Sequence, residues 1–183
     1  MKELLFFIAL LPDEQIQQEV TAFKQYLARH FNATHALKSP PHITLFPPFK
    51  WQESRVNELC ESLHNFTIEY HNFTLSLKNF SGFPPRVLFV DVEKSEALQA
   101  LQRDLEIYLR KNLHLINERP HSTFNAHMTI AHKDLSRALY PQAWAHFSQQ
   151  TYERTFPVHT ITLLEHRRGK WEVYEKFEMR NLK

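Results

Sequence analysis

Two short segments of the chain each place a histidine and a threonine two residues apart. The first is PHITLF, with His42 and Thr44, and the second is AHMTI, with His127 and Thr129. Side chains two apart in a β-strand point to the same face. Each segment would therefore present an imidazole and a hydroxyl on one face and apolar residues on the other. Four prolines within residues 39–49 predict that the first strand is short.

Two histidines and two hydroxyl groups that share a groove fit the cleavage of a phosphodiester. One neutral imidazole removes a proton from the attacking hydroxyl or water, while a second, protonated imidazole donates one to the leaving oxygen. A histidine pKa of about 6.5 lets both forms coexist near neutral pH. Threonine hydroxyls can bind the non-bridging phosphate oxygens, where negative charge develops. The predicted catalytic set is His42, Thr44, His127 and Thr129, and this chemistry requires no metal and no cofactor.

A His-x-Thr triplet alone is weak evidence, because a chain with 12 histidines produces about one by chance. A third triplet, His121-Ser122-Thr123, lacks the apolar residues that back the other two, and we interpret it as accidental. The stronger signal is the fuller pattern of histidine, apolar residue, threonine and apolar residue. That pattern occurs twice, once in each half of the chain.

The order of predicted elements also repeats. The first half reads as strand 3–10, helix 12–31, strand 42–46, helix 52–65 and strand 72–80. The second half reads as strand 86–92, helix 93–113, strand 125–132, short helix 136–147, and strands 158–166 and 170–180. His42 and His127 are 85 residues apart, and Leu77 and Leu163 are 86 apart, which indicates a repeat of about 85 residues. We therefore expect an α+β fold in one domain, residues 1–183, built of two pseudo-repeats at about 1–85 and 86–183.

Composition and charge narrow the classes of function. The chain has 183 residues, 43% of them hydrophobic, and 15 phenylalanines, which predicts a folded core. A net charge of +2 argues against extensive electrostatic binding of long nucleic acid. The single cysteine, Cys60, allows no internal disulfide, so we expect a cytoplasmic protein. The apolar run Leu4–Leu11 is too short to span a bilayer, so no membrane partner is expected.

The two motifs, together with the opening LLFFIALLP and the bridge FSGFPPRVLFVDV, resemble the 2H phosphoesterase superfamily, specifically its 2′-5′ RNA ligase-like branch. The resemblance covers nearly the whole chain. It implies a bilobal fold with two antiparallel β-sheets, helices outside, and a central cleft that holds both motifs. It also implies hydrolysis of a 2′,3′-cyclic phosphate, on an RNA end or a small nucleotide, to a 2′-phosphate. His127 would then activate water while His42 protonates the leaving 3′ oxygen.

The chain departs from the family pattern after the second motif. Relatives often carry an arginine there, where this chain has Ala131-His132. Strand alternation predicts Ala131 on the cleft face and His132 on the back. Arg86 matches the family pattern by position and is a candidate substrate-binding residue, as is Phe46, which shares the strand face of His42 and could stack a nucleobase. We interpret Lys38 and Lys133, which flank the motifs, as surface lysines.

Other functions remain open from the sequence. The same fold could act as a reversible 2′-5′ RNA ligase or as a non-catalytic protein that binds an RNA end or a phosphate. The intact histidine and threonine in both motifs argue against a non-catalytic binding protein, because arginine or lysine would bind a phosphate better. A zinc site is not predicted, because the chain has no cysteine pair and no helix with suitably spaced histidines. We expect a monomer that binds an RNA 2′,3′-cyclic phosphate end or a small cyclic nucleotide.

Overall fold

The computed structural model of the chain describes residues 2–117 and 124–181. Four helices and eight strands make up this part of the chain. The helices are α1 (Glu14–Phe31), α2 (Val56–Thr67), α3 (Glu96–Leu113) and α4 (Tyr140–Phe147). The strands are β1 (Glu3–Leu10), β2 (Ile43–Gln52), β3 (Phe73–Phe83), β4 (Val87–Val92), β5 (His127–Ala131), β6 (Glu153–Val158), β7 (Thr160–Arg167) and β8 (Lys170–Glu178). Two 3₁₀ turns, η1 (His35–Lys38) and η2 (Glu53–Arg55), precede β2 and α2.

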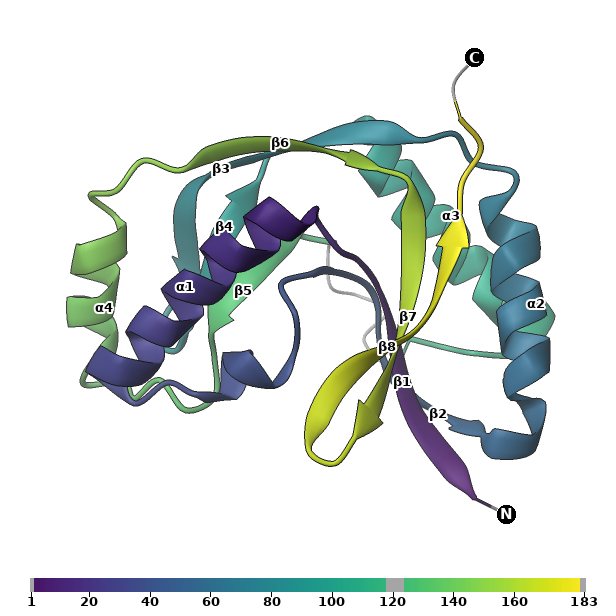
Figure 1. Cartoon of the computed structure of the whole chain (residues 1–183), viewed down its shortest axis with the longest axis horizontal. Coiled ribbons are helices and arrows are strands. Elements are labelled where there is room, and N and C mark those ends of the chain that lie inside the picture. Colours follow the sequence, from purple (N-terminus) through teal and green to yellow (C-terminus); the bar gives the residue numbers. More distant parts are fainter. Residues whose placement is uncertain (1, 118–123, 182–183) are drawn as a thin grey trace.

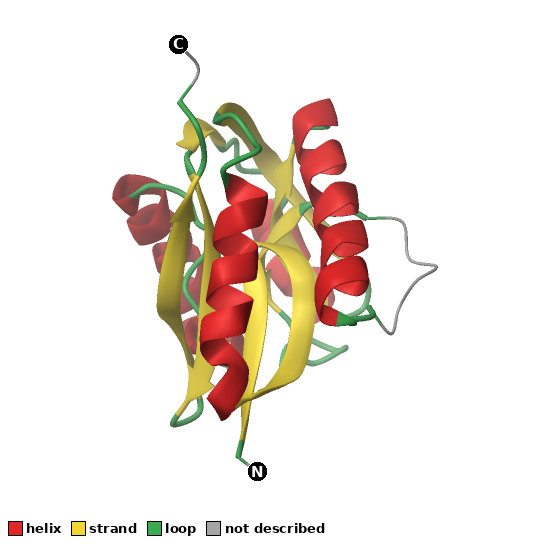
Figure 2. Cartoon of the chain, turned by 90° about the vertical axis from the view of Figure 1, so that its right-hand side faces the viewer, coloured by secondary structure: helices red, strands yellow, loops and turns green. Residues whose placement is uncertain are grey.

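The strands form two antiparallel four-stranded sheets. The first sheet has the order β2-β1-β7-β8, and the second has the order β5-β4-β3-β6. Helices α2 and α3 cover the first sheet, and α1 and α4 lie beside the second (Figure 1). Figure 2 shows α2 and α3 on the outside of the first sheet. The predicted α+β class, with two antiparallel sheets and external helices, is confirmed.

The halves of the sequence do not coincide with the two sheets. Strand β3, from the first half, pairs with β4, and β7, from the second half, pairs with β1. Helix α1 packs against β5, and α3 packs against β2, so each long helix also crosses to the other half. The boundary near residue 85 lies in the turn between β3 and β4 and separates neighbours within one sheet. The two halves of the sequence are thus interleaved in both sheets.

The two long helices match closely, which favours the predicted duplication. Both have 18 residues and begin at a side-chain cap, Asp13 for α1 and Ser95 for α3. Both end at a residue with φ 55°, Asn32 and His114, each 82 positions from its counterpart. Their buried faces follow the same spacing, because Ile16, Val20 and Leu27 of α1 correspond to Leu98, Gln102 and Leu109 of α3. That the halves arose by duplication stays a prediction.

Several elements differ from their predicted bounds, and one strand was not predicted. Strand β2 runs on through Pro47 and Pro48 to Gln52, so α2 begins four residues later than predicted, at Val56. Strand β6 was not predicted. Only Phe156 and Val158 are buried along it, so the alternation of apolar and polar residues is short, and the strand contains Pro157. Proline is tolerated there because β6 is an edge strand, where one backbone N–H side faces away from the sheet.

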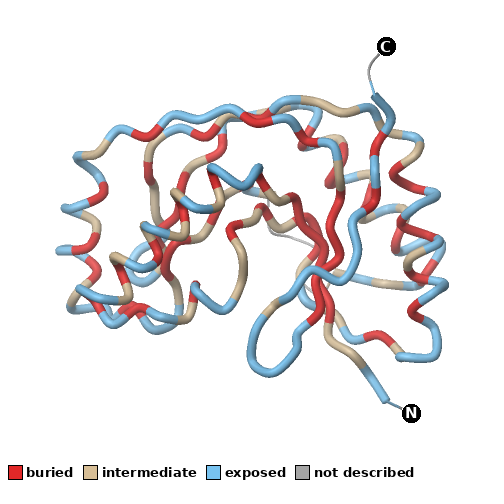
Figure 3. The backbone as a smooth tube through the Cα atoms, in the orientation of Figure 1, coloured by how far each residue is buried: buried red, intermediate tan, exposed pale blue. Residues whose placement is uncertain are grey.

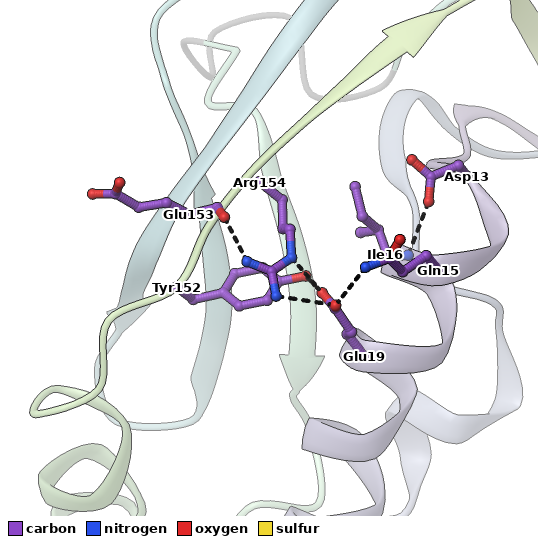
Figure 4. Close-up of polar contacts among 7 residues, drawn as sticks. All are labelled: Asp13, Gln15, Ile16, Glu19, Tyr152, Glu153 and Arg154. Atoms are coloured by element: carbon purple, nitrogen blue, oxygen red, sulfur yellow. Dashed lines mark hydrogen bonds and ion pairs between the residues drawn. The ribbon is translucent and has the colours of Figure 1, made fainter.

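Helix α1 is fixed to β6 by an ion-pair network (Figure 4). The Glu19 carboxylate accepts hydrogen bonds from the Tyr152 hydroxyl at 2.8 Å and from Arg154 Nε and Nη2 at 2.8 and 3.0 Å. The Arg154 guanidinium lowers the pKa of Glu19. Such a bidentate pair fixes geometry as well as contributing energy. It ties the first helix of the chain to the edge of the second sheet.

The core runs through both sheets and includes Ile161, Leu163 and Phe177 of the β7–β8 hairpin, whereas the turn of this hairpin, residues 166–170, is exposed (Figure 3). A second, small cluster lies apart from it and consists of Phe7, Ala9 and Leu164, with Leu11 and Trp171 packed against it. Within the described part of the chain, no helix is both long enough and apolar enough to cross a membrane.

Gly82 in β3 is expected to be essential for packing. A Cβ atom there would overlap the Tyr140 hydroxyl at the start of α4 and would lie 2.7 Å from the Val87 carbonyl oxygen. Gly82→Ala should therefore lower the free energy of unfolding by about 1–3 kcal/mol, the usual effect of overpacking. Urea denaturation measures this as a lower midpoint. Adding Tyr140→Phe, which removes the hydroxyl, should recover part of the loss, and an unchanged midpoint in the single variant would contradict the packing argument.

Candidate active site

A β-bulge in β2 decides which side chains of the first motif reach the cleft. Thr44 pairs with Ala9 and Phe46 pairs with Ile8, so Leu45 is an extra residue on β2. The strict alternation ends at this point, and Leu45 and Phe46 both turn to the core. Phe46 is 1% exposed and packs in the main core cluster, so the prediction that it shares the cleft face with His42 is wrong. The bulge is the physical reason.

Strand β5 contains the same bulge at the equivalent place. Thr129 pairs with Phe89 and Ala131 pairs with Leu88, which leaves Ile130 as the extra residue. Ala131 is consequently buried in the core, and His132 lines the cleft. The predicted orientations of these two residues are therefore reversed. Both motifs use one extra apolar residue to turn the following side chain inward.

The two motif histidines are held in the same orientation. His42 Nδ1 lies 2.7 Å from the Pro40 carbonyl oxygen, and His127 Nδ1 lies 2.7 Å from the Asn125 carbonyl oxygen. A carbonyl oxygen only accepts, so each Nδ1 carries a hydrogen and donates it. In the neutral imidazole Nε2 is then the unprotonated nitrogen. A phenylalanine ring also packs on each imidazole, Phe7 at 4.8 Å from His42 and Phe89 at 4.9 Å from His127.

Both motifs line one cleft between the two sheets, with a volume of about 640 Å³. The first sheet and its hairpin contribute Phe7, His42, Thr44, Pro48, His166, Gly169 and Trp171. The second sheet and the loops beside it contribute Phe83, Val87, His127, Thr129, His132 and Lys133. The segment around η1 supplies His35, Ala36, Lys38 and Ser39. No carboxylate occurs among these described lining residues, so the cleft favours an anion.

The first motif histidine lies in surroundings that disfavour its protonated form. Burial lowers the pKa of His42 to about 4, although the Pro40 carbonyl works in the opposite direction. The positive charge of Lys24 and the nearby imidazoles of His127 and His132 lower the pKa further. At neutral pH His42 is therefore almost entirely neutral in the free protein. The effect comes from the surroundings of the ring and not from its hydrogen bond to Pro40, which acts in the opposite direction.

A second pair of imidazoles lies at the η1 side of the cleft. The rings of His35 and His132 meet edge to face, with centroids 4.7 Å apart. Burial lowers the pKa of His132 to about 4, and burial and the lysine charges also lower the pKa of His35. Asp134 fixes this corner, since its carboxylate accepts from the backbone N–H groups of Thr34 and His35, each at 2.7 Å.

The flanking cations border the cleft. Lys38 and Lys133 are exposed, as expected from the sequence, and both also belong to the cleft lining. Arg86 is exposed at the start of β4 and lies outside the lining, where its Nη1 donates to the Lys133 carbonyl oxygen at 3.3 Å. Arg86 thus supports the loop that carries Lys133. A substrate-binding role for Arg86 stays a prediction.

The lining residues that sequence reasoning missed include His35, His166 and Trp171. His166 and Trp171 face each other across the β7–β8 hairpin, with ring centroids 5.0 Å apart. The turn residues Arg168 and Gly169 have φ 48° and 80°, as a tight two-residue hairpin requires. The sequence RRGK signals such a turn, but nothing local indicates that the hairpin borders the cleft. The accidental triplet at His121 lies outside the described residues.

No group of three or more histidine, cysteine, aspartate or glutamate side chains within residues 2–117 and 124–181 is placed to hold a metal ion.

Comparison with known proteins agrees with the motifs. Residues 12–170 match the family model described as the 2′-5′ RNA ligase superfamily. The chain belongs to this superfamily. The resemblance seen in the paired motifs is thereby confirmed.

The relatives and solved structures cover nearly the whole chain. A protein of Geobacillus sp. strain WCH70 named "Putative phosphoesterase" is 28% identical over 175 residues, which is 93% of each chain. Escherichia coli LigT in complex with 3′-AMP superposes with a TM-score of 0.70 at 16% identity, over 97% of this chain and 99% of that one. TT0787 of Thermus thermophilus has a TM-score of 0.67 at 16% identity, over 97% and 98%. The superfamily and these names support a phosphoesterase, and the superpositions show a shared fold.

Proposed function

We propose that the protein hydrolyses 2′,3′-cyclic phosphates, on RNA ends or small nucleotides, to 2′-phosphates, with His42 and His127 as the acid–base pair. One observation carries this proposal. Two imidazoles with identical Nδ1–carbonyl hydrogen bonds line one cleft together with two threonines, and the described lining contains no carboxylate. Each Nε2 is left to exchange a proton with the substrate, which is what hydrolysis of a phosphodiester requires.

We propose His42 as the base, opposite to the direction that the family resemblance implies. With a pKa of about 4, His42 is neutral at pH 7, which favours it as a proton acceptor and disfavours it as a proton donor. His42 Nε2 takes a proton from water as the water oxygen attacks phosphorus. The P–O3′ bond breaks, and protonated His127 donates its Nε2 hydrogen to the departing 3′ oxygen. Thr44 and Thr129 donate to the non-bridging oxygens, where negative charge increases.

The walls of the cleft fit a nucleotide. Trp171 and His166 on the β7–β8 hairpin offer aromatic faces for a base, the role that buried Phe46 cannot fill. Lys38 and Lys133 offer positive charge for phosphate groups. A volume of about 640 Å³ suits a mononucleotide or the end of an RNA strand. LigT, which shares the fold, is described in complexes with 3′-AMP and with phosphate.

The family name favours a second candidate, reversible 2′-5′ ligation. In ligation a ribose hydroxyl would replace water as the attacking group, and the same two histidines would transfer the protons. In the reverse direction the acid acts as the base and the base acts as the acid. A panel of substrates separates the two activities.

The direct test is an assay of 2′,3′-cyclic nucleotides and of RNAs with 2′,3′-cyclic ends in the presence of excess EDTA. We expect turnover to a 2′-phosphate at the same rate with and without the chelator, because proton transfer and hydroxyl contacts suffice. Product position is read by ³¹P NMR, and an RNA with a 5′-hydroxyl acceptor tests for ligation. A double variant, His42→Ala with His127→Ala, controls for contaminating nucleases. Activity that disappears with EDTA and returns with a divalent ion would refute the metal-free mechanism.

A further inference from the structure

A lysine is buried behind the first motif. Lys24 on α1 is 1% exposed, and its Nζ donates to the Ser39 carbonyl oxygen at 3.0 Å. Burial lowers the pKa of Lys24 from 10.5 to about 7. Burying an ammonium group with so little compensation is unfavourable for folding, and an apolar side chain would stabilise this position more. Stability therefore does not explain a lysine at this position, which indicates a functional role.

The contact of Lys24 reaches the base through the backbone. Ser39 ends the η1 turn and lies three residues before His42. The next carbonyl, that of Pro40, accepts the hydrogen bond from His42 Nδ1. Lys24 thus holds the segment that orients the imidazole. Helix α1, which carries Lys24, also packs against β5, the strand of the second motif.

The charge of Lys24 also acts on two cleft imidazoles. It disfavours the protonated forms of His42 and His132. The other groups that act on His42 are His127 and His132, which are both basic. His132 is further influenced by His35 and Lys133, and among these described neighbours only Asp134 acts in the opposite sense. Lys24, His127 and His132 therefore all favour the neutral form of His42.

The matching position of the other long helix does not carry a lysine. The matching position of α3, 82 residues later, is Glu106, which is half-buried. Its carboxylate accepts a hydrogen bond from Gln102 Nε2 at 3.3 Å. Two matched helices thus carry opposite charges at equivalent places. Because the motifs themselves are alike, this difference is a candidate source of their unequal roles.

We infer that Lys24 is a positioning residue that makes the two motif histidines unequal, by fixing the segment from Ser39 to His42 and by setting His42 as the proton acceptor. The inference rests on the proposed function, and it assigns a role to a residue that has no direct contact with the cleft. It accounts for a buried cation that stability alone would not select.

The test is Lys24→Met, which fills the same space without the charge or the hydrogen bond. We expect the NMR titration midpoint of His42 to rise by roughly half to one pH unit. The acid limb of the kcat/KM profile should move up by the same amount. Activity should therefore fall more at pH 5 than at pH 8. Lys24→Arg, which keeps a positive charge, should retain the wild-type limb, and Glu106→Gln on the matching face of α3 should leave both readouts unchanged.

The variant should fold. The pKa of Lys24 is lower in the folded protein, so the unfolded chain binds the proton more tightly, and wild-type stability rises as pH increases from about 7 to 10.5. Lys24→Met should have a higher urea midpoint at pH 7 and should lack this particular rise. That result confirms burial of the charge, but a purely structural lysine would give it too.

The decisive result is therefore the histidine titration. If Lys24→Met changes the urea midpoint but leaves the His42 titration and the acid limb where they were, the inference is wrong. A rise in the His127 midpoint instead of that of His42 would also overturn it. The titration uses the protein without substrate, so it decides the inference even if no cyclic phosphate is hydrolysed, an outcome that would reject the proposed function separately.

Discussion

Replacing His42 or His127 with alanine should each lower kcat for a 2′,3′-cyclic phosphate by about 10²- to 10⁴-fold. Each substitution removes one of the two proton transfers, which the remaining imidazole cannot supply from its own side of the phosphate. The measurement is steady-state hydrolysis of a cyclic nucleotide, with KM determined separately. We expect KM to change much less than kcat, since the proton is transferred only in the transition state.

The double variant tests whether the two histidines act as a unit. Because both transfers belong to one step, His42→Ala with His127→Ala should cost little more than the more damaging single change. His121→Ala, in the triplet interpreted as accidental, is the matched control and should be near wild type. Equal damage from His121→Ala and His127→Ala would mean that the second motif has been assigned to the wrong histidine.

Replacing Thr44 or Thr129 with valine should lower kcat/KM by about 10- to 100-fold, the expected effect of losing one hydrogen bond to a charged group. Valine keeps the branched shape in the strand and removes only the hydroxyl. The loss should be smaller than for either histidine. Comparing kcat/KM for the two single variants shows whether the two hydroxyls contribute equally to stabilising the phosphate.

The threonine prediction has a matched control in each strand. Thr44→Ser and Thr129→Ser keep the hydroxyl and should recover most of the activity, whereas a valine variant with a packing defect would not be rescued in this way. Valine variants as active as the wild type would remove the threonines from phosphate binding. The phosphate contacts would then have to come from Lys38, Lys133 or His132.

The sequence alone determined the family, the class of fold and the two motifs. Alternation of apolar and polar residues over PHITLF and AHMTI identifies strands with one polar face, since side-chain direction in a strand is a local property. The same holds for α1, where the spacing of apolar residues predicted a helix over residues 12–31 and the structure has one over Glu14–Phe31. That four motif residues line one cleft also followed, because the repeat implies approximate two-fold symmetry.

Local patterns could not reveal the bulges. A bulge depends on the register between two strands, and the extra residues Leu45 and Ile130 look like ordinary members of an alternating strand. One unnoticed extra residue reverses the direction of the next side chain. For this reason Phe46 was expected in the cleft and lies in the core, while His132 was expected behind the strand and lies in the cleft.

Tertiary structure alone decided the electrostatics of the site. Lys24 appears in the sequence as one more charged residue of an amphipathic helix, and only the packing of α1 on the second sheet brings it behind the first motif. Contacts between distant segments also decide that β3 lies in the second sheet and β7 in the first, and where the β7–β8 hairpin lies. The two motifs share the same pattern of histidine, apolar residue, threonine and apolar residue. The low pKa of His42 comes from burial and from neighbouring charges, which the chain acquires only when it folds.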